Sequence, residues 1–262
     1  MTVDSPNVWP LMGIQLFTGT MDEAREAVVA RIGGPEPVPM MTVAVWTLIH
    51  ARENPQFMEA LRRCPIVLPD GWPVVMLVKM AGRPIRGRLA GADFVLIGAS
   101  WCAENQRRLV LYGSTDGVAQ RAAERLKSLG PGLDVVGLTP PFKESFSEAD
   151  AEAIAGELRA LSPAIVIVGI AAPKGELLID KLAPRLPGVV VLGVGGALDN
   201  TAGIRRRAPR IVQRLYFEWL WRTLQNPKDK LPRVVENLTK WPVLWARLLK
   251  DARAGGGGER AA

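Results

Sequence analysis

The stretch RLVLYGSTDGVAQRAAERLKSLGPGLDVVG, residues 108–137, carries the pattern that decides the fold. A mostly apolar run at 108–112 is followed by a glycine-containing turn at 113–117, a helical pattern at 118–129 and a second mostly apolar run at 133–137. Short apolar runs are typical of strands that are buried on both faces, and helices between them connect parallel strands. The stretch therefore predicts a βαβ unit.

The same alternation extends along the chain in both directions. Thr20 and Glu23 form a capping-box pattern, which predicts a helix start, and Asn54-Pro55 predicts a break or a second start in a helix. Together these patterns predict an α/β fold, with a Rossmann-like, mostly parallel sheet and helices on both faces. The further strands are expected at 40–45, 66–68, 164–169 and 189–194, and the further helices at 48–62, 72–80, 91–105, 147–161 and 177–186.

Composition divides the chain into three parts. We predict a Rossmann-like domain at 1–203, a basic, tryptophan-rich helical appendage at 204–253 and a disordered tail at 254–262. The segment 205–253 holds 13 Lys or Arg and 4 Asp or Glu, a balance of +9, whereas the whole chain carries +7. The positive charge therefore belongs to the appendage, as expected for a surface that meets phosphates or anionic lipid.

Several classes of protein are disfavoured. Two cysteines, Cys64 and Cys102, make no disulfide framework and indicate a reducing compartment. We see no signal peptide and no run of the roughly 20 apolar residues that span a bilayer, so we expect a cytoplasmic protein whose membrane contact is peripheral. His50 is the single histidine, which argues against a histidine triad or a multi-histidine metal site. We expect no metal, no cofactor and no nucleic-acid partner.

Candidate functional residues follow the predicted strands, because open α/β sheets bind ligands beyond the carboxyl ends of their strands. Asp70 is either a general base or an ordinary turn aspartate. The turns at Gly113-Ser114 and Gly195-Gly196 either hold phosphate through backbone N–H groups or simply reverse the chain. The remaining candidates for substrate or nucleotide binding are Gly71, Lys174, Asp199, Arg205, Arg207, Arg210 and Arg222.

The appendage leaves two pairs of interpretations open. Its arginines either bind a diphosphate in bidentate fashion or form a solvated basic face. Its tryptophans, interleaved with basic residues, either lie at an anionic bilayer interface or pack against the α/β domain or a partner subunit. These tryptophans are Trp219, Trp221, Trp241 and Trp245.

Motifs over roughly residues 12–235 resemble the WecG/TagA/CpsF family of bacterial glycosyltransferases, glycosyltransferase family 26. They are NPQF at 54–57, LPDGWPV at 68–74, GRP at 82–84, RLAGAD at 88–93, VGIAAPK at 168–174, GVGGALD at 193–199, AG at 202–203, RAP at 207–209 and EWLWR at 218–222. The resemblance implies a metal-independent, inverting transferase at the inner face of the cell membrane. Its donor would be a UDP-sugar, often of N-acetylmannosamine or its uronic acid, and its acceptor a polyprenyl-diphosphate-linked saccharide.

The resemblance also assigns roles and marks departures. It implies that Asp70 is the base, that Thr42 helps to position the substrates and that appendage arginines hold the diphosphate. Ala44, Ala90 and Gly175 stand where the family usually has Asn, Thr and Gln, and Asn226 replaces a Glu. These changes indicate a different donor or acceptor, a slower enzyme or a fold kept for another purpose. Two alternatives therefore stay open: a transferase acting on a soluble small molecule, and a non-catalytic binding or scaffold protein. A homo-oligomer is also left open.

Overall fold

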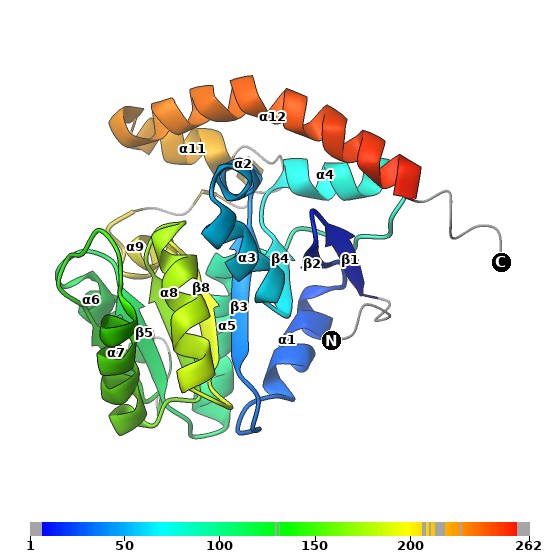
Figure 1. Cartoon of the computed structure of the whole chain (residues 1–262). Coiled ribbons are helices and arrows are strands. Elements are labelled where there is room, and N and C mark those ends of the chain that lie inside the picture. The colour runs from blue at the N-terminus through cyan, green and yellow to red at the C-terminus, as the bar shows by residue number, and fades with distance from the viewer. Residues whose placement is uncertain are drawn as a thin grey trace.

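The computed structural model describes residues 7–128, 130, 132–205, 208, 209, 211, 212, 218–225 and 227–255 (Figure 1). The strands are β1 (Val8–Leu11), β2 (Ile14–Phe17), β3 (Val38–Val43), β4 (Ile66–Pro69), β5 (Leu109–Gly113), β6 (Val135–Leu138), β7 (Ile165–Gly169) and β8 (Val190–Gly193). The helices are α1 (Met21–Val29), α2 (Val45–Glu53), α3 (Pro55–Arg63), α4 (Trp72–Met80), α5 (Gly91–Glu104), α6 (Val118–Lys127), α7 (Glu148–Leu161), α8 (Lys174–Leu182), the 3₁₀ turn η1 (Ala183–Arg185), α9 (Ala197–Thr201), α11 (Glu218–Gln225) and α12 (Pro227–Gly255).

The strands form one sheet in the order β1-β2-β4-β3-β8-β7-β5-β6. Each neighbouring pair is parallel except β1 with β2. Every residue of β4, β5, β7 and β8 is buried, because helices cover both faces of the sheet (Figure 1). One apolar cluster joins the sheet to α2, α3, α4, α7, α8 and α12, and the other joins it to α1, α5, α6 and α9. The predicted α/β fold is confirmed.

Local signals set several helix boundaries as predicted. The Thr20 hydroxyl accepts a hydrogen bond from the Glu23 backbone N–H at 3.2 Å, and the Glu23 carboxylate accepts one from the Thr20 N–H at 2.6 Å. This reciprocal pair confirms the capping box at the start of α1. The break at Asn54-Pro55 is a second start: the Asn54 side chain caps α3 by accepting a hydrogen bond from the Phe57 N–H at 3.0 Å.

The edge strand β1 was not predicted. It forms a hairpin with β2 through Met12 and Gly13, whose φ angles of +57° and +82° match the left-handed conformations of a two-residue hairpin turn. Pro10 lies within β1 opposite Gln15. A proline removes a backbone donor and interrupts the strand pattern in the sequence, but an edge strand tolerates it because its outer side is unpaired.

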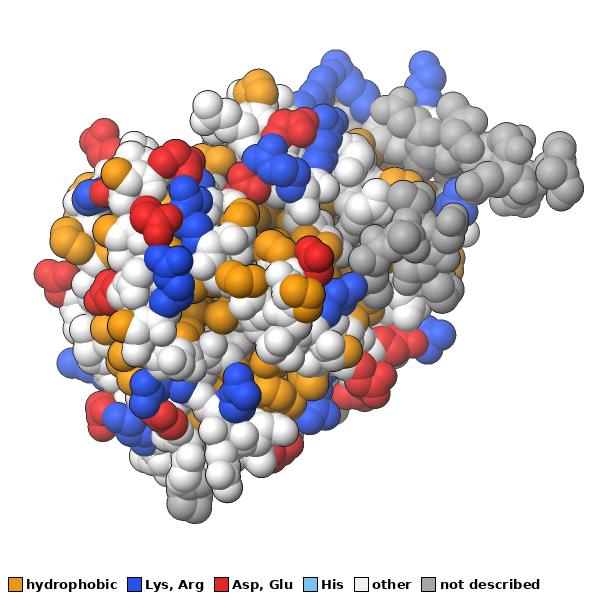
Figure 2. Space-filling view, turned by 60° about the horizontal axis from the view of Figure 1, so that its bottom comes forward, with side chains coloured by type: hydrophobic (Ala, Val, Ile, Leu, Met, Phe, Trp, Pro, Cys, Tyr) orange, Lys and Arg blue, Asp and Glu red, His pale blue; other side chains and the backbone are white. Residues whose placement is uncertain are grey.

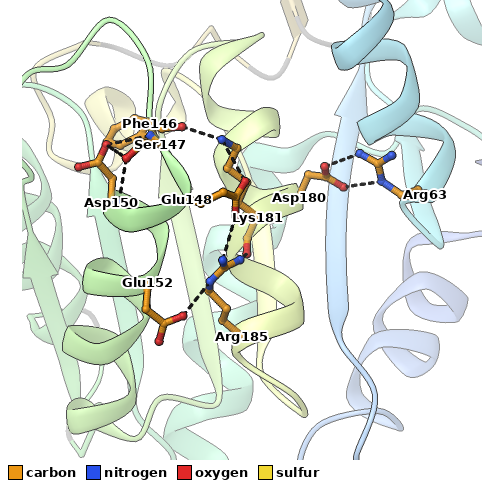
Figure 3. Close-up of polar contacts among 9 residues, drawn as sticks. All are labelled: Arg63, Phe146, Ser147, Glu148, Asp150, Glu152, Asp180, Lys181 and Arg185. Carbon is orange, nitrogen blue, oxygen red and sulfur yellow. Dashed lines mark hydrogen bonds and ion pairs between the residues drawn. The ribbon is translucent and has the colours of Figure 1, made fainter.

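Ion pairs connect neighbouring helices on one face of the sheet (Figure 3). The Arg63 guanidinium of α3 donates two hydrogen bonds, of 3.1 and 2.6 Å, to the Asp180 carboxylate of α8. Arg185 donates to Glu148 at 2.8 Å and to Glu152 at 3.0 Å, which ties η1 to α7. Seen from the end where the parallel strands begin, basic and acidic side chains are interspersed (Figure 2). This face therefore presents no broad field of one sign in that view.

The appendage is helical and packs on the α/β body. α12 lies across α2 and α4 at the end of the sheet where the parallel strands finish (Figure 1). Trp241, Leu244 and Leu248 are buried in the same apolar cluster as α2 and α4, and Trp245 is partly buried against it. For these two tryptophans the packing interpretation is therefore correct.

The proposed division at residue 203 stays a prediction, although α12 shares the core of the α/β body. Of the predicted tail, Ala254 and Gly255 belong to α12, and the rest lies outside the described residues. Within the described part of the chain, no helix has both the length and the apolar character needed to cross a bilayer.

Candidate active site

Thr42 and Asp70 lie next to each other at the carboxyl ends of adjacent strands. Thr42 of β3 is in register with Leu68 of β4, and the Asp70 backbone N–H donates to the Val43 carbonyl oxygen at 2.8 Å. The Asp70 side chain is 28% exposed. The fold therefore places Thr42 and Asp70, which are 28 positions apart in the sequence, at neighbouring strand ends on the edge where ligands of parallel sheets bind.

Arg88 holds the Asp70 carboxylate from the other side. Its Nε donates to Asp70 Oδ1 at 3.0 Å, and its side chain is only 18% exposed. The next residue, Leu89, donates its backbone N–H to the Pro69 carbonyl oxygen at 3.0 Å, which fixes the loop beside β4. Arg88 was not predicted as a site residue, although it begins the RLAGAD motif at 88–93.

The start of α5 closes on the same edge. A Cβ at Gly91 would lie 2.9 Å from Thr42 Cγ2 and 3.4 Å from the Gly193 carbonyl oxygen. A side chain there would press on both β3 and β8, so this position requires glycine. The close approach makes the first turn of α5 the wall beside Thr42.

A second polar group lies further along the edge. The Ser114 hydroxyl donates to Asp199 Oδ1 at 2.9 Å, and Arg205 Nε contacts Asp199 Oδ2 at 3.3 Å. The Ser114 backbone N–H donates to the Gly169 carbonyl oxygen at 3.0 Å, which ties the turn after β5 to the end of β7. Three of the predicted binding residues, from separate segments, are thus in direct contact.

Three predicted glycines adopt conformations that other residues rarely take. Gly71, Gly113 and Gly195 have φ angles of +111°, +109° and +51°. A Cβ at Gly195 would meet no atom of the described residues within 4 Å, so this part of the chain leaves its backbone open beside Gly196. The structure supports the turn role of these glycines, and their role in phosphate binding stays a prediction.

Lys174 contacts the loop that follows β6. Its ammonium donates to the Lys143 carbonyl oxygen at 2.6 Å and lies 4.5 Å from the centroid of the Phe142 ring. Phe142 is 87% exposed, so the cation–π contact covers only one part of an otherwise solvated ring. Lys174 therefore connects the loop after β7 with the loop after β6. Its predicted contact with a diphosphate is untested.

The remaining arginines cannot be placed as side chains. Arg207 and Arg210 lie outside the described residues. Arg222 belongs to α11, but its side chain lies outside the described part. Their predicted roles in diphosphate binding stay predictions.

Glu176 is a buried carboxyl group that the sequence analysis did not single out. It lies in the first turn of α8 and is 5% exposed, and its Oε2 has no hydrogen-bond partner among the described residues. Burial raises the pKa of Glu176 to about 7, since an ionised carboxylate is poorly solvated there. A Cβ at Gly193 would lie 4.0 Å from its Oε1, so the group sits under the end of β8.

Comparison with known proteins decides the family. Residues 9–255 match the sequence profile of the glycosyl transferase WecG/TagA/CpsF family. The chain belongs to this family of glycosyltransferases. The match begins at the second residue of β1 and ends at the last residue of α12. The fold described above is therefore that of a family member.

Three similar proteins carry the name N-acetylglucosaminyldiphosphoundecaprenol N-acetyl-beta-D-mannosaminyltransferase. The relative from Bacillus spizizenii strain W23 is 31% identical over 178 residues, which cover 68% of this chain and 67% of that protein. The relative from Bacillus subtilis strain 168 is 27% identical over 179 residues, with the same coverage. The relative from Staphylococcus aureus strain MW2 is 24% identical over 204 residues, which cover 78% of this chain and 76% of that protein.

The departures from the family pattern have local structural consequences. Ala44 and Ala90 are the N-cap residues of α2 and α5, and neither offers a side-chain hydrogen bond to the helix start. Asn and Thr, the usual family residues there, are good N-caps. At Gly175, a Cβ would overlap the carbonyl oxygen of Ile170. A glutamine therefore does not fit the backbone at this position in the first turn of α8.

Restoring a cap at α2 should stabilise the protein. Ala44 has the extended backbone of an N-cap residue, with φ −114° and ψ 178°, and is only partly buried. Ala44→Asn is expected to raise the free energy of unfolding by about 1 kcal/mol in urea titrations. Ala44→Leu, which has no capping oxygen, is the control and should not give this gain. Equal effects of the two variants would contradict the missing-cap interpretation.

Glu176 should make stability depend on pH near neutrality. Its folded-state pKa of about 7 lies above the unfolded value of 4.5, so the folded state keeps a proton that the unfolded state has lost between these values. The wild type should therefore lose stability relative to Glu176→Gln as the pH rises from 4.5 to 7. The difference in Tm between variant and wild type should be larger at pH 8 than at pH 5. The matched control is exposed Glu157, replaced in the same way. An equal difference in Tm at pH 5 and pH 8 for Glu176→Gln would contradict the prediction.

Proposed function

We propose that this protein transfers an N-acetylmannosamine-like sugar from a UDP-sugar to a polyprenyl-diphosphate-linked acceptor, with inversion and without a metal ion. The observation that carries the proposal is the alignment of two polar groups on one sheet edge in a family member: Thr42 with Asp70, and Ser114 with Asp199 and Arg205. The names of the relatives supply the sugar and the lipid-linked acceptor.

The strand order supports a donor lying along this edge. From β3, which carries Thr42, three inter-strand steps lead through β8 and β7 to β5, a distance of about 14 Å at the usual strand spacing. A sugar at Thr42 and Asp70 would place the diphosphate at the Gly195 turn. The nucleoside would then extend toward Ser114. Each part of a UDP-sugar thus meets a different strand end.

Each residue then has a defined chemical task. Asp70, oriented by Arg88, would accept the proton of the acceptor hydroxyl as this oxygen attacks the anomeric carbon. The bond from that carbon to the diphosphate would break on the opposite face, which inverts the configuration. Arg205 and the predicted cations Lys174, Arg207, Arg210 and Arg222 would offset the charge that develops on the leaving UDP.

Replacing the proposed base tests this mechanism. Asp70→Asn keeps the size and the hydrogen-bonding capacity but cannot accept the proton, so kcat should fall by about 100-fold or more. The assay is turnover of UDP-N-acetylmannosamine with an N-acetylglucosaminyl-diphosphate lipid. Asp22→Asn, an exposed position on α1, is the control and should retain wild-type kcat. Full activity of Asp70→Asn would remove Asp70 from the role of base.

A specific observation favours a second candidate, a related transferase acting on a soluble small molecule. Ala44, Ala90 and Gly175 remove three polar side chains around the predicted cleft, which would suit a different substrate. This candidate would be supported if the enzyme transferred the sugar to a soluble small-molecule acceptor and not to the lipid-linked acceptor. A wild type that binds no UDP at millimolar concentration would instead favour a scaffold role.

We assign the membrane contact to the outer side of the appendage, at the inner face of the cell membrane. The exposed large apolar residues that the structure describes on α11 and α12 are Leu220, Leu224, Leu231, Val235, Leu238 and Val243. Interleaved basic residues suit an anionic bilayer surface. We assign the membrane contact to this surface and not to Trp241 and Trp245, because these two tryptophans pack on the α/β body.

The double variant Leu231→Glu/Leu238→Glu tests that surface. It should lose binding to anionic vesicles in co-sedimentation, because it places two charges on the apolar side of α12. Leu96→Glu, at an exposed leucine on α5, is the control and should bind as the wild type does. Equal binding of all three proteins would refute the assignment, and no binding by the wild type would favour the soluble-acceptor alternative.

A further inference from the structure

A four-residue polar cluster joins α2 to α12. His50 Nε2 lies 3.2 Å from Glu236 Oε2, and the Lys240 ammonium donates to Glu53 at 2.7 Å and to Glu236 at 3.0 Å. His50 and Glu53 belong to α2, whereas Glu236 and Lys240 belong to α12. We call these four residues the α2–α12 latch. They explain the single histidine, for which the active site has no use.

Within the latch, each carboxylate contacts a basic side chain. Hydrogen bonds from Lys240 and His50 lower the pKa of Glu236, and those to Glu53 and Glu236 raise the pKa of Lys240. The histidine and the two carboxylates resemble a metal-binding set, because their ligand atoms lie within 4.8 Å of one another. Lys240, however, already supplies a positive charge that bridges the two carboxylates. The geometry therefore favours an ion-pair latch over a cation site.

The latch connects α12 to a helix that begins close to the predicted catalytic pair. α2 begins two residues after β3, which carries Thr42, and α4 begins two residues after Asp70. α12 packs on both helices (Figure 1). Its position is thus tied to the two strand ends that carry the predicted catalytic pair.

Outside the latch, α12 packs on the α/β body mainly through apolar side chains. Trp241, Leu244 and Leu248 provide apolar burial, which is non-directional. Asn237 Oδ1 and the indole nitrogens of Trp241 and Trp245 are buried without a hydrogen-bond partner among the described residues. Among the described residues, the latch supplies directional contacts between α2 and α12, which help to set where along α2 the appendage rests.

We infer that His50 and Lys240 are positioning residues that hold the appendage over the candidate active site and so control access of the lipid-linked acceptor. The inference rests on the proposed function for the identity of the acceptor. The latch does not touch the reacting atoms. Its loss should therefore weaken binding of the acceptor rather than slow the chemical step.

Hydrogen exchange of the full chain tests the latch without any substrate. His50→Ala and Lys240→Ala should each increase exchange of α12 amides about tenfold, as expected for the loss of hydrogen bonds to charged groups. Amides of α6 should be unchanged. His50→Gln, which can place an amide nitrogen near Glu236, should restore much of the protection. Lys127→Ala, which breaks an exposed ion pair with Glu124 on α6, is the control and should leave α12 at the wild-type rate.

Kinetics provide the second readout. His50→Ala should raise KM for the lipid-linked acceptor several-fold and change kcat less than about twofold. Wild-type exchange rates of α12 in both alanine variants would overturn the inference, as would a fall in kcat at unchanged KM. Protection of α12 by added Zn²⁺ in the wild type would overturn the ion-pair assignment in favour of a metal site. If the wild type shows no transferase activity, the proposed function fails, while the exchange result still decides whether the latch exists.

Discussion

The parallel pairing of β4, β3, β8, β7 and β5 is the constraint on which the rest of the structure depends. Parallel strands that share one sheet all finish at the same edge, so the loops that follow them meet there even when they are far apart in sequence. This places Asp70 beside Thr42, and Ser114 beside Asp199. The same constraint buries the strands on both faces, which requires helices on each side.

The sequence predicted those features that depend on local signals. The bounds of α4 were predicted to the residue, since the left-handed Gly71 precedes the helix and Pro73 suits its first turn. β1 was missed because Pro10 interrupts its pattern, and Arg88 was missed because its contact with Asp70 spans 18 positions. The hydrophobic periodicity of a sequence reflects local structure and does not reveal a contact over this separation. The burial of Glu176 was equally hidden, since glutamate in a first helical turn normally indicates exposure to solvent.

The departures from the family pattern are not all of one kind. Ala44 and Ala90 leave two helix starts without a side-chain cap, at positions where Asn or Thr would fit the observed backbone type. Gly175 differs, because a side chain there would collide with the Ile170 carbonyl. The backbone therefore accepts a side chain at the first two positions, whereas at the third it accepts only glycine. Changes of substrate preference are most naturally sought at the first turn of α8, which carries Lys174, Gly175 and Glu176.

The central claim is that the edge from Asp70 to Ser114 holds a UDP-sugar. Calorimetric titration of UDP into the wild type and into Asp199→Asn tests it most directly, because Asp199 organises both Ser114 and Arg205 at the expected nucleotide end. The account predicts that the wild type binds UDP and that Asp199→Asn binds it about tenfold more weakly or worse, as expected for the loss of charge-assisted hydrogen bonds. Equal affinities for the two proteins, or no binding by the wild type, would contradict it.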